Sequence, residues 1–264
     1  AGSDCDLERT VPAEQYDPSN GDLLIPVVVH VIQNDDATLG WIDRATIENQ
    51  IRILNDDFSG VGISSTDDTV ASGIRFALAG IDPDGGSTIG ITWSQNSVWF
   101  NDQGEYWNTL AWDPTRYLNI YTNTASGNFG YVNQLPAAGF AGEAPDRVVV
   151  DWRVFGEGGS YGSPQDLGRI LTHETGHYLG LFHTFQDGCD GADCSMSGDR
   201  ICDTSSQASP NFECSSADSC GTVDPVSNFM NYSWQACMSE FTPEQVRRMR
   251  CTIQTYRPEL ARMT

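Results

Sequence analysis

The chain has 264 residues, of which 39% are hydrophobic, and this is enough to bury a large core and to exclude intrinsic disorder. Its 36 acidic and 14 basic residues give a formal net charge of −22, which repels phosphate backbones and anionic lipid surfaces. No apolar run approaches the roughly 20 residues needed to cross a bilayer. We therefore expect neither nucleic acids nor membranes among its partners.

The first part of the chain alternates strand-like and helix-like stretches. Leu24–Ile32 is an apolar run typical of a buried strand, in which His30 is expected to be an ordinary core side chain. Asp43 is a favourable cap for a following helix whose apolar residues share one face: Ile47, Ile51 and Leu54. Further strands are predicted at Arg75–Ile81, Tyr117–Tyr121 and Arg147–Val154.

Two helix starts are predicted in the second part. Ser163–Asp166 combines a cap residue, a proline at the first helical position and an acid, which predicts a helix from there to about Leu179, stopping at Gly180. Thr242 and Gln245 match a capping box that opens a C-terminal helix, through about Gln254. Between these helices, Cys189–Gly221 has few periodic apolar residues, so we expect irregular structure there.

These elements predict an α+β fold. It consists of a mixed, mostly parallel twisted sheet with backing and active-site helices, followed by an irregular, disulfide-stapled part that ends in a helix. We expect a single domain over residues 1–264, made of two closely packed subdomains, 1–180 and 181–264.

Most of the eight cysteines lie in the last third of the chain, and no two of them form a CxxC pair. The absence of a CxxC pair disfavours a zinc site made of cysteines. The cysteines could then be either disulfides or reduced thiols of a cytosolic protein. Disulfides in a loop-rich acidic segment fit an oxidising compartment better. We therefore expect a secreted, extracellular protein.

Three of the four histidines lie close together in the sequence. His173 and His177 stand four residues apart on the predicted helix and so face one ion, while Glu174 lies beside that ion without binding it. Gly180 lets the chain turn back, so that His183 supplies a third nitrogen. Three histidines leave one tetrahedral position open, which is typical of catalytic rather than structural zinc.

The run His173–His183 resembles the extended zinc signature of metzincin metallopeptidases, and Met230 stands where these enzymes have a methionine turn below the metal. Over Gln165–Arg250 the chain resembles the pappalysin family of secreted microbial enzymes. Phe229 and Asn231 depart from the family's usual Tyr and Asp, at positions not expected to touch the metal. The motifs that carry the likeness are His183-Thr-Phe185, Gly188-Cys189, Gly198-Asp199, Asp203-Thr204, Asp218-Ser-Cys220, Cys237-Met238 and Phe241-Thr242.

This resemblance implies a metzincin-like fold and a zinc-dependent endopeptidase that cleaves proteins. Glu174 is then the general base, which takes a proton from the zinc-activated water and later delivers it to the leaving amine. Tyr232 is expected to help zinc stabilise the oxyanion, with simple packing as its alternative role. Met230 forms an apolar floor below the histidines. The glycosylation motif at Asn231 is expected to be unused, because a glycan there would collide with the metal site.

The acids between the two predicted helices suggest a second metal. They are Asp187, Asp190, Asp193, Asp199 and Asp203. A solvated face is the simpler interpretation, and calcium, a hard cation that binds oxygen ligands, is the functional one. The family resemblance implies calcium near the site, with Asp199 and the carbonyl of Thr204 as ligands.

The resemblance also implies the disulfides Cys189–Cys220 and Cys214–Cys237. Exclusion and proximity then leave Cys194–Cys202 and Cys5–Cys251. For Cys5 there is a rival interpretation, a leftover pro-segment thiol that once capped the zinc.

A protein or peptide substrate should lie extended along an edge strand, for which Gly130–Pro136 is the candidate. The loop after Met230 is expected to set the specificity pocket, and Gln235 and Ala236 bring no charge there, which disfavours Arg or Lys at P1′. We expect a monomer. Two alternatives are a catalytically silent zinc-binding adhesin or matrix module, disfavoured by the intact Glu174, and a zinc amidase, disfavoured by the methionine turn and third histidine.

Overall fold

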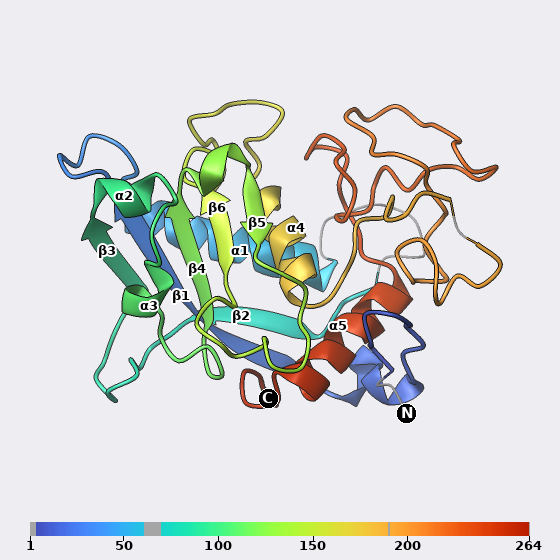
Figure 1. Ribbon diagram of the computed structural model, residues 1–264, viewed down its shortest axis with the longest axis horizontal. Helices are drawn as coiled ribbons and strands as arrows, with labels where there is room; N and C mark the ends of the chain where they lie inside the picture. Colours follow the sequence, from blue (N-terminus) through green and yellow to red (C-terminus); the bar gives the residue numbers. More distant parts are fainter. Residues whose placement is uncertain (1–3, 61–69, 190, 264) are drawn as a thin grey trace.

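The computed structural model describes residues 4–60, 70–189 and 191–263, and their centre is a seven-stranded sheet (Figure 1). Strands β2, β1, β4, β6 and β5 follow one another in space, and β3 and β7 also pair with β1. The pairings are parallel except that β5 runs antiparallel to β6, and β7 to β1. The strands are β1 (Leu23–Gln33), β2 (Ile74–Leu78), β3 (Ile91–Gln95), β4 (Leu118–Asn123), β5 (Gly130–Val132), β6 (Val148–Asp151) and β7 (Arg262–Met263).

The central strand β1 is buried along most of its length, as its near-continuous run of Val and Ile predicts for a parallel sheet covered on both faces. Helix α1 (Arg44–Ser59) packs beside the sheet through a buried face that includes Ile47, Leu54 and Phe58. The carboxylate of Asp43 accepts a hydrogen bond from the Thr46 amide, and the helix ends before a left-handed Gly60. This part of the prediction is confirmed.

The helix that carries two of the histidines, α4, spans Arg169–Tyr178, so the predicted start at Ser163 is wrong. The backbone of Asp166 and Leu167 pairs instead with that of Gly158 and Glu157. Gly168 then has a φ of 74°, a left-handed conformation that a continuing helix does not contain. This pairing overrides the local cap signal, so the residue before the helix is Gly168 and not Ser163.

The strand predictions hold in position but not in length. The stretches expected over Arg75–Ile81 and Arg147–Val154 are strands over five and four residues, and the strand expected from Tyr117 runs on to Asn123. Strand β3 was not predicted. Short helical segments also stand outside the prediction: α2 (Ser97–Phe100), α3 (Trp107–Leu110), and the 3-10 turns Glu14–Tyr16, Pro18–Asn20 and Ala125–Gly127.

Between α4 and the C-terminal helix α5 (Pro243–Tyr256), the described residues form no named helix or strand. Disulfides cross-link this region at Cys189–Cys220, Cys194–Cys202 and Cys214–Cys237, and Cys5–Cys251 ties the N-terminal segment to α5. In Figure 1 these loops lie on the far side of α4 from the sheet, so α4 stands between the two parts of the molecule.

Side-chain bonds fix both ends of α5. Both bonds of the capping box between Thr242 and Gln245 are present at its start, as the sequence predicts. Beyond its end, Arg257 forms a buried ion pair with Asp146 and donates to the carbonyl of Tyr178, the last residue of α4. None of the described helices is long and apolar enough to span a membrane.

Candidate active site

The three clustered histidines converge on one point beside α4. Their ring nitrogens lie within 4.8 Å of one another, and the Nε2 atom of His177 is 3.1 Å from that of His173 and 3.0 Å from that of His183. Two nitrogens that bind one zinc ion at about 2.0–2.1 Å in tetrahedral geometry are separated by roughly 3.3 Å. The arrangement therefore fits a shared metal ion.

In the two histidines of α4, the other ring nitrogen is fixed by the backbone. Nδ1 of His173 donates to the carbonyl of Phe229 at 2.6 Å, and Nδ1 of His177 donates to that of Leu181 at 2.7 Å. These bonds leave both Nε2 atoms unprotonated and turned toward the common point. Burial lowers the pKa of His173 well below its usual value, that of His177 to about 4 and that of His183 to about 3. All three imidazoles are thus neutral at pH 7, as metal ligands must be.

The methionine turn packs directly against α4. A Cβ atom added to Gly176 would lie 2.4 Å from the sulfur of Met230, which is fully buried, so only glycine allows this approach. The amide of Met230 donates to the side chain of Asn228, and that side chain exchanges two hydrogen bonds with Gln245 of the α5 capping box. The same capping residue therefore starts α5 and holds the turn below the histidines.

Glu174 lies beside the histidines and is almost fully buried, with an exposed fraction of 7%. Burial raises the pKa of its carboxyl to about 8. A Cβ atom on Gly130 would come within 2.7 Å of the Glu174 side chain, so strand β5 passes unusually close to this carboxyl. The edge strand and the candidate base are thus in direct contact.

Tyr232 closes the other side of the site. Its ring lies 4.8 Å from that of His183 and 5.6 Å from that of His173, while 39% of the residue remains exposed. Burial and the neighbouring Glu174 raise its pKa, so the hydroxyl is a donor at neutral pH. Phe185 stacks on His183 at 4.7 Å and also contacts Tyr232, which fixes both rings.

A cleft with two hollows runs past these groups. One hollow, of about 410 Å³, lies between β5, the start of α4 and the loop after Met230. The other, of about 460 Å³, is lined by β5, the segment that follows it and the three histidines. Gly130 and Glu174 border both hollows, so the cleft follows the edge strand that was the candidate for substrate binding.

The sequence analysis predicts Gln235 in a specificity pocket, but its side chain lies elsewhere. It is fully buried and does not line the first hollow. Its side-chain oxygen accepts from the amides of Leu167 and Arg169 at 2.8 and 3.2 Å, which caps the start of α4 in place of the missing side chain of Gly168. The sequence gives no local signal for this cap, because the two segments lie far apart along the chain.

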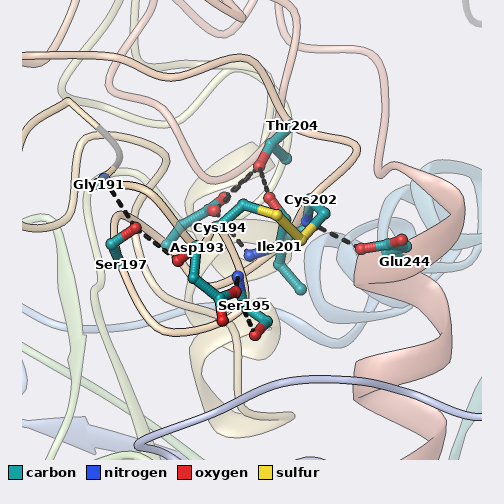
Figure 2. Close-up of a disulfide and its surroundings, with 10 residues drawn as sticks. Gly191, Asp193, Cys194, Ser195, Ser197, Ile201, Cys202, Thr204 and Glu244 are labelled. Carbon is teal, nitrogen blue, oxygen red and sulfur yellow. Dashed lines mark hydrogen bonds between the residues drawn. A yellow bond between two sulfur atoms is a disulfide. The ribbon is translucent and has the colours of Figure 1, made fainter.

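Among the residues that the structure describes, the acids of the C-terminal loops form no group that could hold a metal ion. Asp199 is buried and accepts from the Thr204 hydroxyl and the Ile201 amide, while Asp193 accepts from Ser195. Figure 2 shows these bonds around the Cys194–Cys202 disulfide, with the Cys202 amide donating to Glu244 of α5. Within the described residues, the histidines alone form a metal-binding group of three or more such side chains, and Asp190 lies outside those residues.

The two remaining sequence expectations concern buried side chains. His30 is buried in β1 between the side chains of Thr92 and Asn119, as a core histidine should be. Asn231 is also fully buried, and its amide bonds to Asn211 and to the carbonyl of Pro225, which leaves no room for a glycan.

The mixed sheet, the three converging imidazoles and the carboxyl beside them, placed in a cleft along an edge strand, define a metallopeptidase. A family model described as Pregnancy-associated plasma protein-A (Peptidase_M43) matches residues 102–254, more than half of the chain. The chain belongs to this family, the pappalysins.

Similar proteins agree with this assignment. An extracellular metalloprotease of Pyricularia oryzae is 34% identical over 247 residues, which cover 89% of this chain and 76% of that protein. One from Colletotrichum graminicola is 33% identical, covering 89% and 78%. The structure of mature mirolysin of Tannerella forsythia in complex with a cleaved peptide superposes with a TM-score of 0.74, at 36% identity, covering 90% of this chain and 98% of that one.

Proposed function

We propose that this chain is a secreted zinc endopeptidase. The observation that carries the proposal is the convergence of three neutral imidazole nitrogens, two of them fixed through their Nδ1 atoms to backbone carbonyls. A zinc ion held by His173, His177 and His183 would polarise a water molecule and the carbonyl of the bond to be cleaved. The disulfides and the extracellular naming of the relatives support secretion.

Glu174 acts as the general base in this proposal. Its carboxylate takes the proton of the attacking water and passes it to the leaving amine, which breaks the peptide bond. Its position in the cleft wall between both hollows supports this role, because the reacting bond must pass there. A buried carboxyl with no metal ligation is also free to move a proton between two sites.

Tyr232 donates its hydroxyl to the developing oxyanion. Its ring is packed against His183 and Phe185 but the residue stays partly exposed in the cleft, so the hydroxyl is both held and accessible. Met230 packs below the histidines and fixes α4 at Gly176.

The substrate lies extended along β5. This strand pairs with β6 on one side and borders the cleft with the residues that follow it. No other strand of the described residues pairs with it, so its second edge can offer backbone donors and acceptors to a peptide. We propose that the enzyme works as a monomer, with the residues on both sides of α4 forming one catalytic domain.

We also propose that calcium binds at Asp199 and the carbonyl of Thr204. The buried carboxylate of Asp199 and the acidic composition support a hard cation there, which would compete with the Thr204 hydroxyl for the carboxylate. If so, the melting temperature rises with added calcium in the wild type and not in Asp199→Ala.

Replacement of the general base tests the central proposal. Glu174→Gln should abolish hydrolysis of a proteome-derived peptide library while one zinc per chain is retained, because Glu174 is not a ligand. More than about a tenth of wild-type kcat/KM in this variant would show that another group is the base. A wild-type protein that binds zinc and cleaves no peptide would favour the silent zinc-binding module instead.

A further inference from the structure

The sheet has a second unpaired edge, on the side away from the candidate active site. Strand β3 pairs with β1 and with no other strand of the described residues. In Figure 1 it lies at the opposite end of the sheet from β5 and α4. Exposed strand edges are templates for pairing with another chain, and proteins often protect them with charged side chains or proline. The five residues of β3 include neither.

The register of β3 shows which of its backbone groups face outward. The carbonyl of Gly90, just before the strand, and the amide of Asn96, just after it, both bond to β1 at 2.9 Å. Successive residues of a strand turn their backbone groups alternately to its two sides, so Trp93 and Gln95 turn theirs away from β1. Among the described residues, no other backbone group bonds to these two. We call this unpaired backbone the β3 edge.

Two exposed tryptophans lie beside the β3 edge. The rings of Trp41 and Trp93 stack at 5.9 Å, and 56% and 36% of the two residues are exposed. The indole N–H of Trp93 donates to the carbonyl of Ile42 at 3.0 Å, which fixes its ring against the segment between β1 and α1. Exposed aromatic clusters mark surfaces that bind other molecules. The pair therefore adds an aromatic face to an edge that can accept a strand.

The charge around the two indoles is negative. Segments 33–49 and 79–105, which contain β3 and both tryptophans, have eight acidic residues and one basic residue. The basic residue is Arg44, and an acid of its own helix binds it at 2.7 Å. Just beyond the end of β3, Asp35 exchanges two hydrogen bonds with Ser97. A cationic side chain at this edge would thus meet acids and aromatic faces and no unpaired cation of these two segments.

Two other occupants fit the edge less well. A second copy of this chain would bring another formal charge of −22 and place two acidic edges against each other, which costs free energy. A neutral carbohydrate could stack on the indoles, but it would use neither the charge nor the row of backbone donors and acceptors. A basic, extended chain uses all three features.

We propose that the β3 edge binds an extended, basic segment of another protein. The backbone of that segment adds a strand beside Trp93 and Gln95, and its Arg or Lys side chains lie over the indoles and near the acids. The edge and the cleft lie at opposite ends of the sheet, so a protein can be held at one while the other is occupied. Binding at this edge depends on the fold and not on the proposed peptidase activity.

A short peptide in which Arg alternates with Val tests the proposal. It is titrated against the folded, zinc-loaded Glu174→Gln protein, and mass spectrometry checks that the peptide stays intact. We expect saturable binding with a Kd below about 100 μM that weakens as salt is added. Trp41→Ala in the same background should raise the Kd at least about tenfold, because the exposed indole supplies the cation–π contact.

Trp234→Ala is the matched control for the lost indole. Trp234 is 42% exposed and belongs to the loops between α4 and α5, so its removal should leave the Kd unchanged. Equal binding of a peptide with Glu in place of Arg would overturn the proposal, and so would a Kd that Trp41→Ala does not change. Trp41-dependent binding of chitohexaose, with no binding of the basic peptide, would make the patch a carbohydrate site instead.

The amide of Gln95 tests the addition of a strand. Gln95→Pro removes one outward donor and keeps the bonds to β1, because proline is tolerated where the amide of an edge strand faces solvent. We expect the Kd to rise about tenfold in Gln95→Pro and to stay unchanged in Gln95→Ala, with melting temperatures measured in parallel. A peptide methylated at alternate backbone amides makes the same test without altering the protein. Undiminished binding of both methylated forms, which differ in the set of amides blocked, would show that no strand is added.

Discussion

The parts of the molecule before and after Gly180 are ordered by different means. The first is a sheet in which backbone pairs with backbone and Val and Ile side chains fill the core. The second forms no helix or strand between α4 and α5 in its described residues, and side-chain hydrogen bonds join its loops beside scattered backbone ones. A chain of hydrogen bonds there joins the buried side chains of Thr184, Gln207 and Asn231 to the half-buried Asn211.

The metal site draws on both parts. The first part supplies His173, His177 and Glu174 on one rigid helix, whereas the second supplies His183 and Tyr232 on loops. The side-chain network above links the neighbours of these last two residues, Thr184 and Asn231. A loop residue is therefore placed precisely only by cross-links and buried polar bonds. In a helix, the periodicity of the backbone alone sets the direction of each side chain.

The largest expected effect comes from removing the ligand that the second part provides. His183→Ala should lose zinc as well as activity, because two histidines on one helix leave the ion with too few protein ligands. Metal analysis and peptide hydrolysis measure this together, with Glu174→Gln as the control that keeps the metal. Stoichiometric, tightly held zinc in His183→Ala would contradict a three-histidine site.

The pH dependence of the free energy of unfolding tests the packing of the sheet around His30. Burial lowers the pKa of His30 to about 4 from 6.5. A histidine with a lowered pKa stabilises the fold above the pKa of the unfolded state, and this stability is lost as pH falls from 6.5 toward 4. The loss amounts to roughly 3 kcal/mol when the protonation is complete.

Denaturant unfolding of the wild type and His30→Gln at pH 7 and pH 4.5 measures this contribution. We expect the stability gap between the two proteins to shrink at the lower pH, because the glutamine does not titrate while His30 must be protonated on unfolding. Comparison with the variant cancels the contribution of the other titrating groups. A gap that stays constant would show that His30 is not the group responsible.

Tyr232→Phe tests the oxyanion donor of the second part. Loss of one donor typically costs about 10²–10³ in rate, and the zinc that remains makes the lower end the expected value. The effect should fall on kcat rather than KM, because the contact is made mainly in the transition state. Zinc content and melting temperature should barely change, since the ring still packs on His183. A wild-type kcat would reduce Tyr232 to a packing residue.

The difference between the two parts of the molecule also explains which elements of the fold could be predicted from the sequence. Helices α1 and α5 follow from caps within a few residues, and the buried β1 follows from its apolar run. The predicted start of α4 is too early, because the deciding contacts are a backbone pairing with Glu157 and Gly158, which no helix pattern contains, and a cap from Gln235, 68 residues from Leu167. Strand β3 pairs alongside the second half of β1, a position that its five residues do not specify.

The candidate site divides in the same way. The histidine spacing on α4 predicts a metal site, because helical periodicity fixes the direction of each side chain. No periodicity predicts that Arg153 and Arg169 line the hollow beside α4 or that each pairs with a buried aspartate, since Asp57 comes from α1 and Asp151 from β6. A pocket assembled from several elements becomes visible only once those elements are packed.

The smallest predicted effect concerns a loop of the first part that is itself held by side chains. The carboxylate of Asp102 accepts hydrogen bonds from Tyr106, Asn123, Ser126 and Tyr131, at 2.7 to 3.0 Å. Asp102 and Ser126 both have left-handed backbones, with φ of 58° and 51°, which persist only where surrounding bonds impose them. Of these partners, Tyr131 follows Gly130 in the strand that contacts Glu174, and Ser126 lies in the 3-10 turn Ala125–Gly127 that precedes this strand.

We therefore expect Asp102 to position the edge of β5 at which we propose that the substrate binds. Asp102→Ala should raise KM about tenfold with kcat nearly unchanged, because a loosened edge binds peptide less well while the metal and base stay in place. Asp102→Asn keeps an acceptor oxygen and should recover most of the affinity, and Tyr131→Phe, which removes one of the bonds, should fall between. Melting temperatures measured in parallel separate this from simple destabilisation. Asp102→Ala could instead lower kcat at constant KM, or lower stability alone. Either result would mean that pairing with β6 positions the edge of β5. The first part of the chain would then be held by backbone bonds throughout.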